Sequence, residues 1–221
     1  MRCPPHDEAE LVARARALSG CAIDELARAS GFRVDGPSVS TKGKVGELLE
    51  RALGATGGSS ATWDFPAIRV ELKTIPLDER GVPRESTFVC AVSLLDAERA
   101  EWETSWVRAK LARVLWVPIG PGIDGSRRIG QPCLWSPSEE QQGILKDDFD
   151  EILGRVGSAG IEGLSARVGR WLQLRPKAAH GGVRTRAPGR DCDLIETVPR
   201  GFYLRARFTG AILRDPGACP A

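Results

Sequence analysis

Residues 67–74, with the sequence Ala67-Ile-Arg-Val-Glu-Leu-Lys-Thr74, alternate apolar and charged side chains. In an extended segment the apolar side chains would lie on one face and the charged side chains on the other. This alternation predicts a half-buried β-strand. Asp64 lies in the loop that leads into the predicted strand. We therefore expect a sheet that presents Glu71 and Lys73 on one face, close to Asp64.

On both sides of this strand the hydrophobic periodicity predicts an irregular succession of helices and strands. The predicted helices are residues 7–18, 23–29, 44–53, 97–111 and 139–156, and the other predicted strands are residues 86–94, 114–119, 169–175 and 202–208. An irregular order favours a mixed α/β (α+β) fold over a doubly wound parallel sheet. The sequence contains no internal repeat and no linker that divides it, so residues 1–221 are expected to form a single domain.

The composition excludes several classes of protein. The chain has 221 residues, of which 42% are hydrophobic and 27% charged, a balance typical of a folded globular protein. It has no apolar run near the roughly 20 residues of a membrane helix, and its start resembles no signal peptide. A cytoplasmic protein without membrane contact is therefore expected.

Cysteine and histidine usage limits the possible chemistry. The six cysteines are far apart with no C-x-x-C pair, and there are only two histidines. This spacing disfavours a zinc site and histidine-based catalysis. We interpret the cysteines as reduced thiols. Catalysis would then rest on carboxylates, lysine or arginine, or on a hard metal ion with oxygen ligands.

Charge is distributed unevenly along the chain, although the net charge is only +2. Residues 163–190 contain seven basic residues and no acidic one, and residues 197–210 contain three basic residues and no acidic one. Residues 137–151, in contrast, contain six acidic residues and one lysine. A basic C-terminal third suits a polyanion such as nucleic acid, although a solvated surface of mixed sign would also explain it.

The candidate chemistry lies around the first predicted strand. Glu71 and Lys73 share a strand face, and Asp64 enters from the preceding loop. Carboxylates can hold Mg²⁺, while the lysine can orient a water molecule or offset charge on a phosphate. This combination is suited to metal-assisted phosphodiester hydrolysis. Glu50, on predicted helix 44–53, could add a third carboxylate. The alternative interpretation is that Glu71 and Lys73 lie on a solvated strand face and that Glu50 is a surface residue of its helix.

Seven blocks of the sequence together resemble the MutH family of DNA mismatch-repair endonucleases. They are KGKVGELLERALGA (Lys42–Ala55), WDFPAIRVELKTIP (Trp63–Pro76), STFVCAV (Ser86–Val92), WETSWVRAKLARVLWVPI (Trp102–Ile119), LWSPSEE (Leu134–Glu140), LQLRPKAA (Leu172–Ala179) and VPRGFYL (Val198–Leu204). The blocks occur in the order of the family and span nearly the whole chain. This makes the resemblance far more specific than the short D…E-x-K pattern, which many nucleases share.

The resemblance implies a restriction-endonuclease-like fold, with a central mixed sheet flanked by helices and two lobes that clamp DNA. It implies that Asp64, Glu71 and Lys73 are catalytic and that Glu50 joins Asp64 and Glu71 in a metal site. Lys110 corresponds to a lysine near the phosphate of the active site. The metal ion implied is Mg²⁺, with Mn²⁺ as a possible substitute.

By the same resemblance, Arg175 and Lys177 meet the recognition site and Lys42 contacts DNA. Arginine is suited to donate two hydrogen bonds to guanine in the major groove. Positions two residues apart on one strand can reach the same groove. Binding of phosphates and plain solvation remain alternatives for Arg175 and Lys177.

Tyr203 corresponds to a residue that contacts the adenine region of the site. In a strand over residues 202–208 it would share a face with Arg205 and Arg207. Its ring could sense N6-methylation of adenine, because the methyl group would lie in the major groove. A structural hydrogen bond at the sheet margin is the alternative role. The chain departs from the family pattern within residues 180–196.

The resemblance implies an enzyme that nicks the unmethylated strand of hemimethylated GATC sites in mismatch repair. It implies double-stranded DNA as substrate, activation by the protein MutL, and MutS as an indirect partner. A monomer with one metal site would cut one strand in each encounter. The alternatives are a stand-alone GATC restriction endonuclease of the same fold, and a DNA-binding module that lacks catalysis.

Overall fold

The computed structural model describes residues 2–32, 42–58, 62–95, 97–165, 167–177, 182–191 and 193–220. The chain divides into two compact units, each assembled from separate segments. Unit 1 consists of Met1–Glu85, Ala112–Ser136 and Leu213–Pro216, and unit 2 of Ser86–Leu111, Pro137–Ile212 and Gly217–Ala221. The expected clamp around DNA concerns the placement of the two lobes relative to each other, and it stays a prediction.

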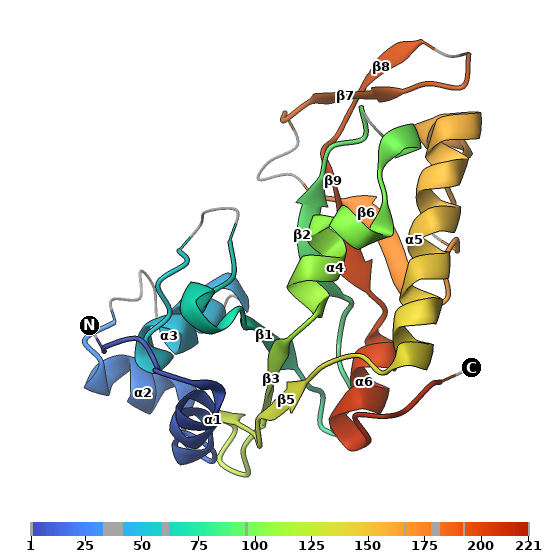
Figure 1. Cartoon of the computed structure of the whole chain (residues 1–221). Helices are drawn as coiled ribbons and strands as arrows, with labels where there is room; N and C mark the ends of the chain where they lie inside the picture. Colours follow the sequence, from blue (N-terminus) through green and yellow to red (C-terminus); the bar gives the residue numbers. More distant parts are fainter. Residues whose placement is uncertain are drawn as a thin grey trace. The chain divides into compact units, whose positions relative to one another are not determined.

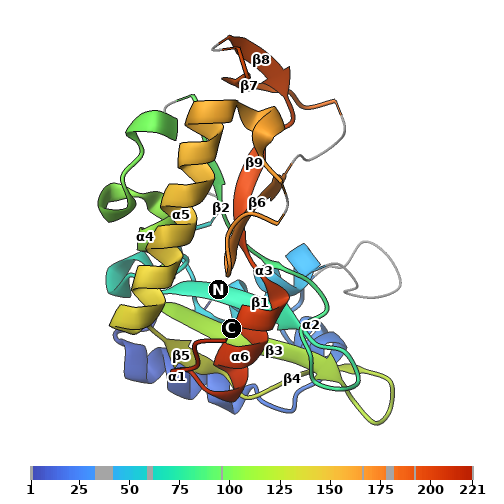
Figure 2. The ribbon, with the colours of Figure 1, turned by 90° about the vertical axis from the view of Figure 1, so that its right-hand side faces the viewer.

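Unit 1 is a mixed sheet with helices (Figure 2). Its elements are α1 (Glu8–Ala17), α2 (Ile23–Ala29), α3 (Lys42–Leu53), β1 (Glu71–Pro76), β3 (Val114–Pro121), β4 (Arg127–Ile129) and β5 (Cys133–Trp135). Strand β1 pairs in parallel with β3, and β3 pairs antiparallel with β4 and β5. The mixed α/β class predicted from the sequence is confirmed.

One hydrophobic core joins the helices of unit 1 to its sheet. It combines Leu11 of α1, Ile23 of α2, Leu48 of α3, Leu72 of β1 and Leu115 of β3, all buried. Helix α3 packs against β1. A close-packed core resists displacement of its elements. Helix α3 and strand β1 therefore hold their functional side chains in a fixed relation.

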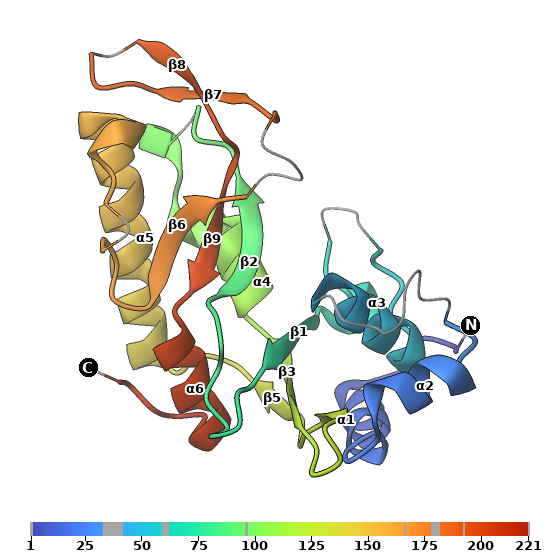
Figure 3. The same cartoon turned by 180° about the vertical axis from the view of Figure 1, so that it is seen from behind.

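Unit 2 is built on an antiparallel sheet in the order β2-β9-β6. Its elements are β2 (Thr87–Val92), α4 (Trp106–Leu111), α5 (Glu139–Ala159), β6 (Leu172–Pro176), β7 (Thr185–Pro188), β8 (Leu194–Thr197), β9 (Arg200–Leu204) and α6 (Ala206–Arg214). Strands β7 and β8 form a separate two-stranded hairpin. Helix α5 runs along one side of the sheet (Figure 1), and the view from behind shows the opposite side (Figure 3).

Aromatic side chains fix which face of this sheet is covered. Phe202 of β9 stacks on Phe149 of α5 with ring centroids 5.5 Å apart, and Trp102 meets the same Phe149 ring at 5.6 Å. Leu174 pairs with Phe202 in the register of β6 and β9 and is also buried. Tyr203, the next residue along β9, therefore points away from α5.

Several predicted elements are confirmed, and others are wrong in part. The long helix over residues 139–156 is confirmed as α5, which starts at a capping box between Ser138 and Gln141. The predicted helix 97–111 is broken: Ser105 is extended, and its hydroxyl accepts a hydrogen bond from Arg108 N that begins α4.

No helix in the described residues is long and apolar enough to cross a membrane.

The predicted strand 202–208 is also wrong in its second half. Strand β9 ends at Leu204, and α6 begins at Ala206. Arg205 N donates to Trp171 O at 2.8 Å, and Phe208 N donates back to Arg205 O at 3.0 Å. The chain therefore turns from strand to helix at Arg205, and Tyr203 does not share a strand face with Arg205 or Arg207.

Candidate active site

The first residues of β1 carry the predicted pair of charged side chains. Lys73 Nζ donates to Glu71 Oε1 at 2.7 Å. The Glu71 side chain is only 3% exposed and that of Lys73 15%. Contact between side chains two positions apart is what the strand geometry predicts. The predicted solvated strand face, the alternative interpretation, does not describe so buried a pair.

Asp64 reaches this pair because the segment before β1 is not a strand, contrary to the prediction for residues 67–74. Pro66–Ile68 form a turn of 3₁₀ helix, and Arg69 takes a left-handed conformation with φ 52°. Phe65 and Val70 then exchange two backbone hydrogen bonds, of 3.0 and 3.3 Å. The reversal brings Asp64 back to the sheet, where its Oδ2 accepts from Leu72 N at 2.7 Å.

The loop that follows α3 supports Asp64 from its backbone side. Thr56 N and Gly57 N both donate to Asp64 O, at 3.0 and 3.1 Å. A Cβ at Gly57 would lie 2.0 Å from Trp63 O, a distance no side chain can adopt. Only glycine therefore permits this approach, which fixes the backbone that places the Asp64 carboxylate.

Glu50 adds a third carboxylate from α3. Its pKa is raised to about 7, because burial disfavours the charged form and because the charges of Asp64 and Glu71 repel it. The charge of Lys73 acts in the opposite direction but is outweighed. Glu50 thus lies within electrostatic reach of all three predicted catalytic residues.

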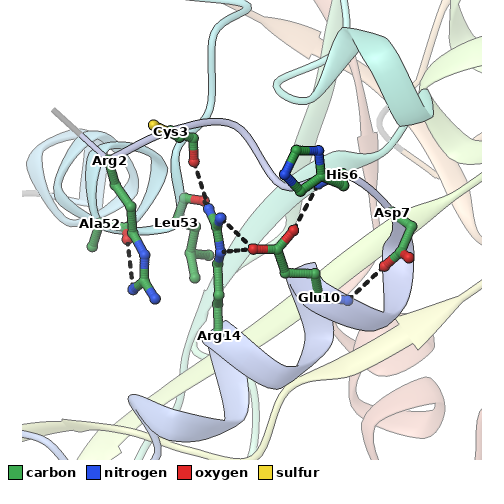
Figure 4. Close-up of polar contacts among 8 residues, drawn as sticks. All are labelled: Arg2, Cys3, His6, Asp7, Glu10, Arg14, Ala52 and Leu53. Atoms are coloured by element: carbon green, nitrogen blue, oxygen red, sulfur yellow. Dashed lines mark hydrogen bonds and ion pairs between the residues drawn. The ribbon is translucent and has the colours of Figure 1, made fainter.

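The N-terminal segment holds the end of α3, as Figure 4 shows. The Arg14 guanidinium of α1 donates to Leu53 O at 3.0 Å and to Cys3 O at 2.6 Å, while Glu10 accepts from its Nε at 3.1 Å. Gly54 follows with φ +88°, where a Cβ would lie 2.4 Å from Cys3 O. These contacts stop α3 at a defined point and so fix where Glu50 lies.

The donor set of this cluster suits a hard divalent cation. Asp64, Glu71 and Glu50 offer carboxylate oxygens, and the pKa of Glu50 is raised first by burial and then by the charges of Asp64 and Glu71. Within the described residues, no group of three or more His, Cys, Asp or Glu side chains is arranged to hold a metal ion by itself. Mg²⁺ commonly takes only one or two carboxylates and completes its shell with water and substrate phosphate. The residues therefore fit Mg²⁺ bound in that way.

Two further predicted site residues lie elsewhere. Lys110 is on α4 in unit 2, 8% exposed, with its Nζ 5.4 Å from the centre of the Trp106 ring. Lys42 is the first residue of α3, but its side chain falls outside the described part of the structure. The predicted roles of both residues remain predictions.

Three of the four predicted DNA-contacting residues gather on the face of the unit 2 sheet that points away from α5, which we call the open face. The Arg175 guanidinium lies 5.6 Å from the centre of the Tyr203 ring, and Lys177 Nζ lies 4.7 Å from that of Phe88. Phe88 and Tyr203 meet edge to face at 5.3 Å. The structure thus brings Arg175, Lys177 and Tyr203 into one patch of two rings and two cations.

Phe88 is a member of this patch that sequence reasoning missed. The sequence predicted a strand over residues 86–94 but assigned no role to Phe88, which is half-buried in the structure. A bulge between Phe88 and Cys90 in the pairing with β9 changes which side chains face outward. Gly201 makes room for the ring, since a Cβ there would lie 2.7 Å from it. The absence of a side chain at Gly201 is the one signal in the sequence that points to this packing.

Comparison with known proteins identifies relatives of this chain. Residues 53–148 match a family model described as "MutH: DNA mismatch repair enzyme MutH". The chain is 45% identical to the DNA mismatch repair protein MutH of Serratia proteamaculans and 46% identical to that of Yersinia enterocolitica. It is 45% identical to that of Escherichia coli. Each comparison covers 95% of this chain and 93% of the relative.

Proposed function

The chain belongs to the MutH family of DNA mismatch repair enzymes, and we propose that it nicks the unmethylated strand of DNA at hemimethylated GATC sites. The observation that carries this proposal is the cluster at the start of β1. There Lys73 pairs with Glu71, and the Asp64 carboxylate accepts from the backbone of Leu72 between them, within a chain 45% identical to MutH proteins. The cluster supplies the groups that phosphodiester hydrolysis needs.

We propose Mg²⁺, which Mn²⁺ could replace, as the cofactor, held by Asp64 and Glu71 with Glu50 in support. A divalent ion supplies Lewis-acid activation of the phosphodiester and of a water molecule. The residues orient the reactants: Leu72 N fixes Asp64 Oδ2, and Lys73 Nζ fixes Glu71 Oε1. Lys73 also brings a positive charge to the site, which offsets the negative charge that develops on the attacked phosphate.

Lys110 is proposed to act near the same phosphate, as the family resemblance implies. Its Nζ is held over the Trp106 ring, an arrangement that keeps the ammonium oriented while it is largely buried. A buried ammonium interacts more strongly with a phosphate than one in bulk water, because the local dielectric constant is lower. We assign it a charge-stabilising role.

Recognition of the site is assigned to the open face of unit 2. Arg175 is exposed and lies beside the Tyr203 ring, and its planar guanidinium can address a guanine edge with two hydrogen bonds. Tyr203 is packed against Phe88 and is therefore rigid. A rigid ring near the adenine amino group would clash with an N6-methyl, so the methylated strand would be rejected by repulsion.

The proposals for partners and location rest on family membership. We propose that the protein acts as a monomer in the bacterial cytoplasm, that MutL activates it, and that MutS acts through MutL. A monomer has one carboxylate cluster and so cuts one strand in each encounter.

The decisive experiment uses a duplex with one GATC in its unmethylated, hemimethylated and fully methylated forms, with and without MutL. We expect Mg²⁺-dependent nicking of unmethylated strands only, stimulated by MutL and lost in Asp64→Ala. Concerted cutting of both strands without MutL would instead indicate a restriction endonuclease. Specific binding without any cutting would indicate a DNA-binding module.

A further inference from the structure

A cavity of about 480 Å³ in unit 2 is lined by three arginines, Arg167, Arg205 and Arg207. None of the described residues that line this cavity is acidic. We call it the arginine pocket. It lies beside β6, because Gln173 contributes to its wall. Three guanidinium groups around one cavity form an environment suited to an anion.

Backbone contacts hold two of these arginines in place. Arg205 Nε donates to Gly169 O at 3.1 Å and its Nη2 donates to Val168 O at 3.0 Å. Arg207 Nη2 donates to Arg170 O at 3.1 Å. The pKa of Arg205 is lowered, first by burial and then by the charge of Arg207. The positive charges in the pocket therefore repel one another, and an anion would relieve that repulsion.

Neutral donors complete the pocket. Gln173 is 6% exposed, and its Nε2 donates to Ser86 Oγ at 2.6 Å. Because Ser86 accepts this bond, its own hydroxyl hydrogen can be donated to a ligand. Helix α6 begins at Ala206, another lining residue, and its N-terminal end adds a positive partial charge. The pocket thus combines charged and neutral donors, as phosphate-binding sites do.

We propose that the arginine pocket binds one phosphodiester of the DNA backbone, beyond the base that Arg175 reads. Gln173 and Arg175 are two residues apart on β6 and pair with Tyr203 and Gly201 of β9, so both lie on the open face. This spacing is roughly 7 Å along the strand, or about two base-pair steps at roughly 3.4 Å each. A DNA strand that runs along β6 on the open face would therefore place a neighbouring phosphate at the pocket. The inference rests on the proposed function.

The first test measures the affinity of the full-length protein for a GATC duplex of about 20 base pairs at several salt concentrations. The variants are Arg167→Ala and the double variant Arg167→Ala/Arg207→Ala, because Arg205 has too many structural contacts to be removed cleanly. Arg155→Ala is the matched control: Arg155 is an exposed arginine of α5, on the covered side of the sheet. We expect the double variant to bind about tenfold or more weakly. The slope of log affinity against log salt should fall by about 1 for each phosphate that the variant no longer binds.

The second test locates the phosphate. Methylphosphonates replace single phosphates, one at a time, within about four nucleotides of GATC on each strand. We expect one position at which the neutral linkage weakens binding by the wild-type protein but not by the double variant. Such coupling at one position distinguishes a pocket contact from general attraction between charges.

Two results would overturn the inference while leaving the proposed function intact. In the first, the double variant matches Arg155→Ala in both affinity and salt slope. In the second, the loss of affinity of the double variant relative to the wild-type protein is the same at every methylphosphonate position. A wild-type protein that binds no duplex, or that cleaves without regard to GATC, would overturn the proposed function and this inference with it.

Discussion

Glu50 is half-buried on α3, and its pKa is raised to about 7 by burial and by the charges of Asp64 and Glu71. In the unfolded chain its pKa returns to the ordinary value of 4.5. The folded state therefore binds a proton more tightly than the unfolded state between these two values, so stability falls as the pH rises through this window. Above about pH 7 the whole of this destabilisation is present.

We therefore predict that Glu50→Gln raises the melting temperature of the metal-free protein by a few degrees at pH 8 and changes it little at pH 4.5. Glutamine removes the charge and keeps the shape. The measurement is thermal unfolding in EDTA at the two pH values, with Glu79→Gln, at an exposed glutamate of unit 1, as control. Equal shifts at pH 4.5 and pH 8, or no shift at pH 8, would contradict the assignment of Glu50 to the cluster.

At the scale of residues, the site was predictable where only local geometry decides it. The contact of Glu71 with Lys73 follows from their spacing in a strand. The position of Asp64 did not follow, because it depends on the left-handed conformation of Arg69. That conformation is uncommon for a residue with a side chain. Nothing in the alternating pattern of residues 67–74 signals it.

Among the elements, β6 carries Arg175 and is anchored at its start by one buried carboxylate. Asp148 of α5 is 4% exposed. Its Oδ1 accepts from Arg170 N at 2.5 Å, and its Oδ2 accepts from Trp171 N and Leu172 N at 2.6 and 2.7 Å. This one side chain satisfies three backbone donors and links α5 to the first residue of the strand.

We predict that Asp148→Asn destabilises the protein by about 1–3 kcal/mol, because the amide nitrogen cannot accept and a buried donor loses its partner. For a chain of this length the melting temperature should fall by roughly 2–12 °C. Thermal unfolding measures this fall, and Asp147→Asn, an exposed neighbour on α5, is the control. If the two variants melt together, Asp148 does not anchor β6.

Elements were predictable where they are long and amphipathic, and were missed where single contacts decide them. Helix α5 has 21 residues and a capping box, so its sequence alone predicts it. Residues 97–111 have helical periodicity throughout, yet Ser105 interrupts them with a cap. Strands β4, β5, β7 and β8 have three or four residues each. Pairing with distant partners, and not local pattern, creates strands this short.

In the molecule as a whole, most groups proposed for hydrolysis lie in unit 1 and most groups proposed for recognition lie in unit 2; the exceptions are Lys110 of unit 2 and Lys42 of unit 1. The carboxylate cluster of Glu50, Asp64 and Glu71 belongs entirely to unit 1. The acid-free basic stretches, residues 163–190 and 197–210, belong entirely to unit 2 together with Tyr203. Each unit is nevertheless built from several chain segments, so neither can be obtained by a single cut. Hydrolysis and recognition should therefore be separable by substitution but not by truncation.

Asp64→Ala should reduce nicking by about 100-fold or more, since even the outer partners of metal ligands contribute roughly 10–100-fold. It should leave the preference for GATC over random duplex unchanged, because no group of unit 2 is altered. Arg175→Ala should lose about 1–3 kcal/mol of that preference if it reads a base edge. Its residual nicking should still require the metal ion.

Both variants are compared with the wild-type protein by equilibrium binding to GATC and random duplexes and by nicking at saturating duplex. Saturation matters because it removes the binding defect of Arg175→Ala from the measured rate, so that a remaining loss reports on chemistry alone. If Asp64→Ala lost its sequence preference, or if Arg175→Ala at saturation nicked as slowly as Asp64→Ala, the two functions would not be divided between the units. Equal weakening on GATC and random DNA would instead assign Arg175 to the phosphate backbone, in line with the neighbouring arginine pocket.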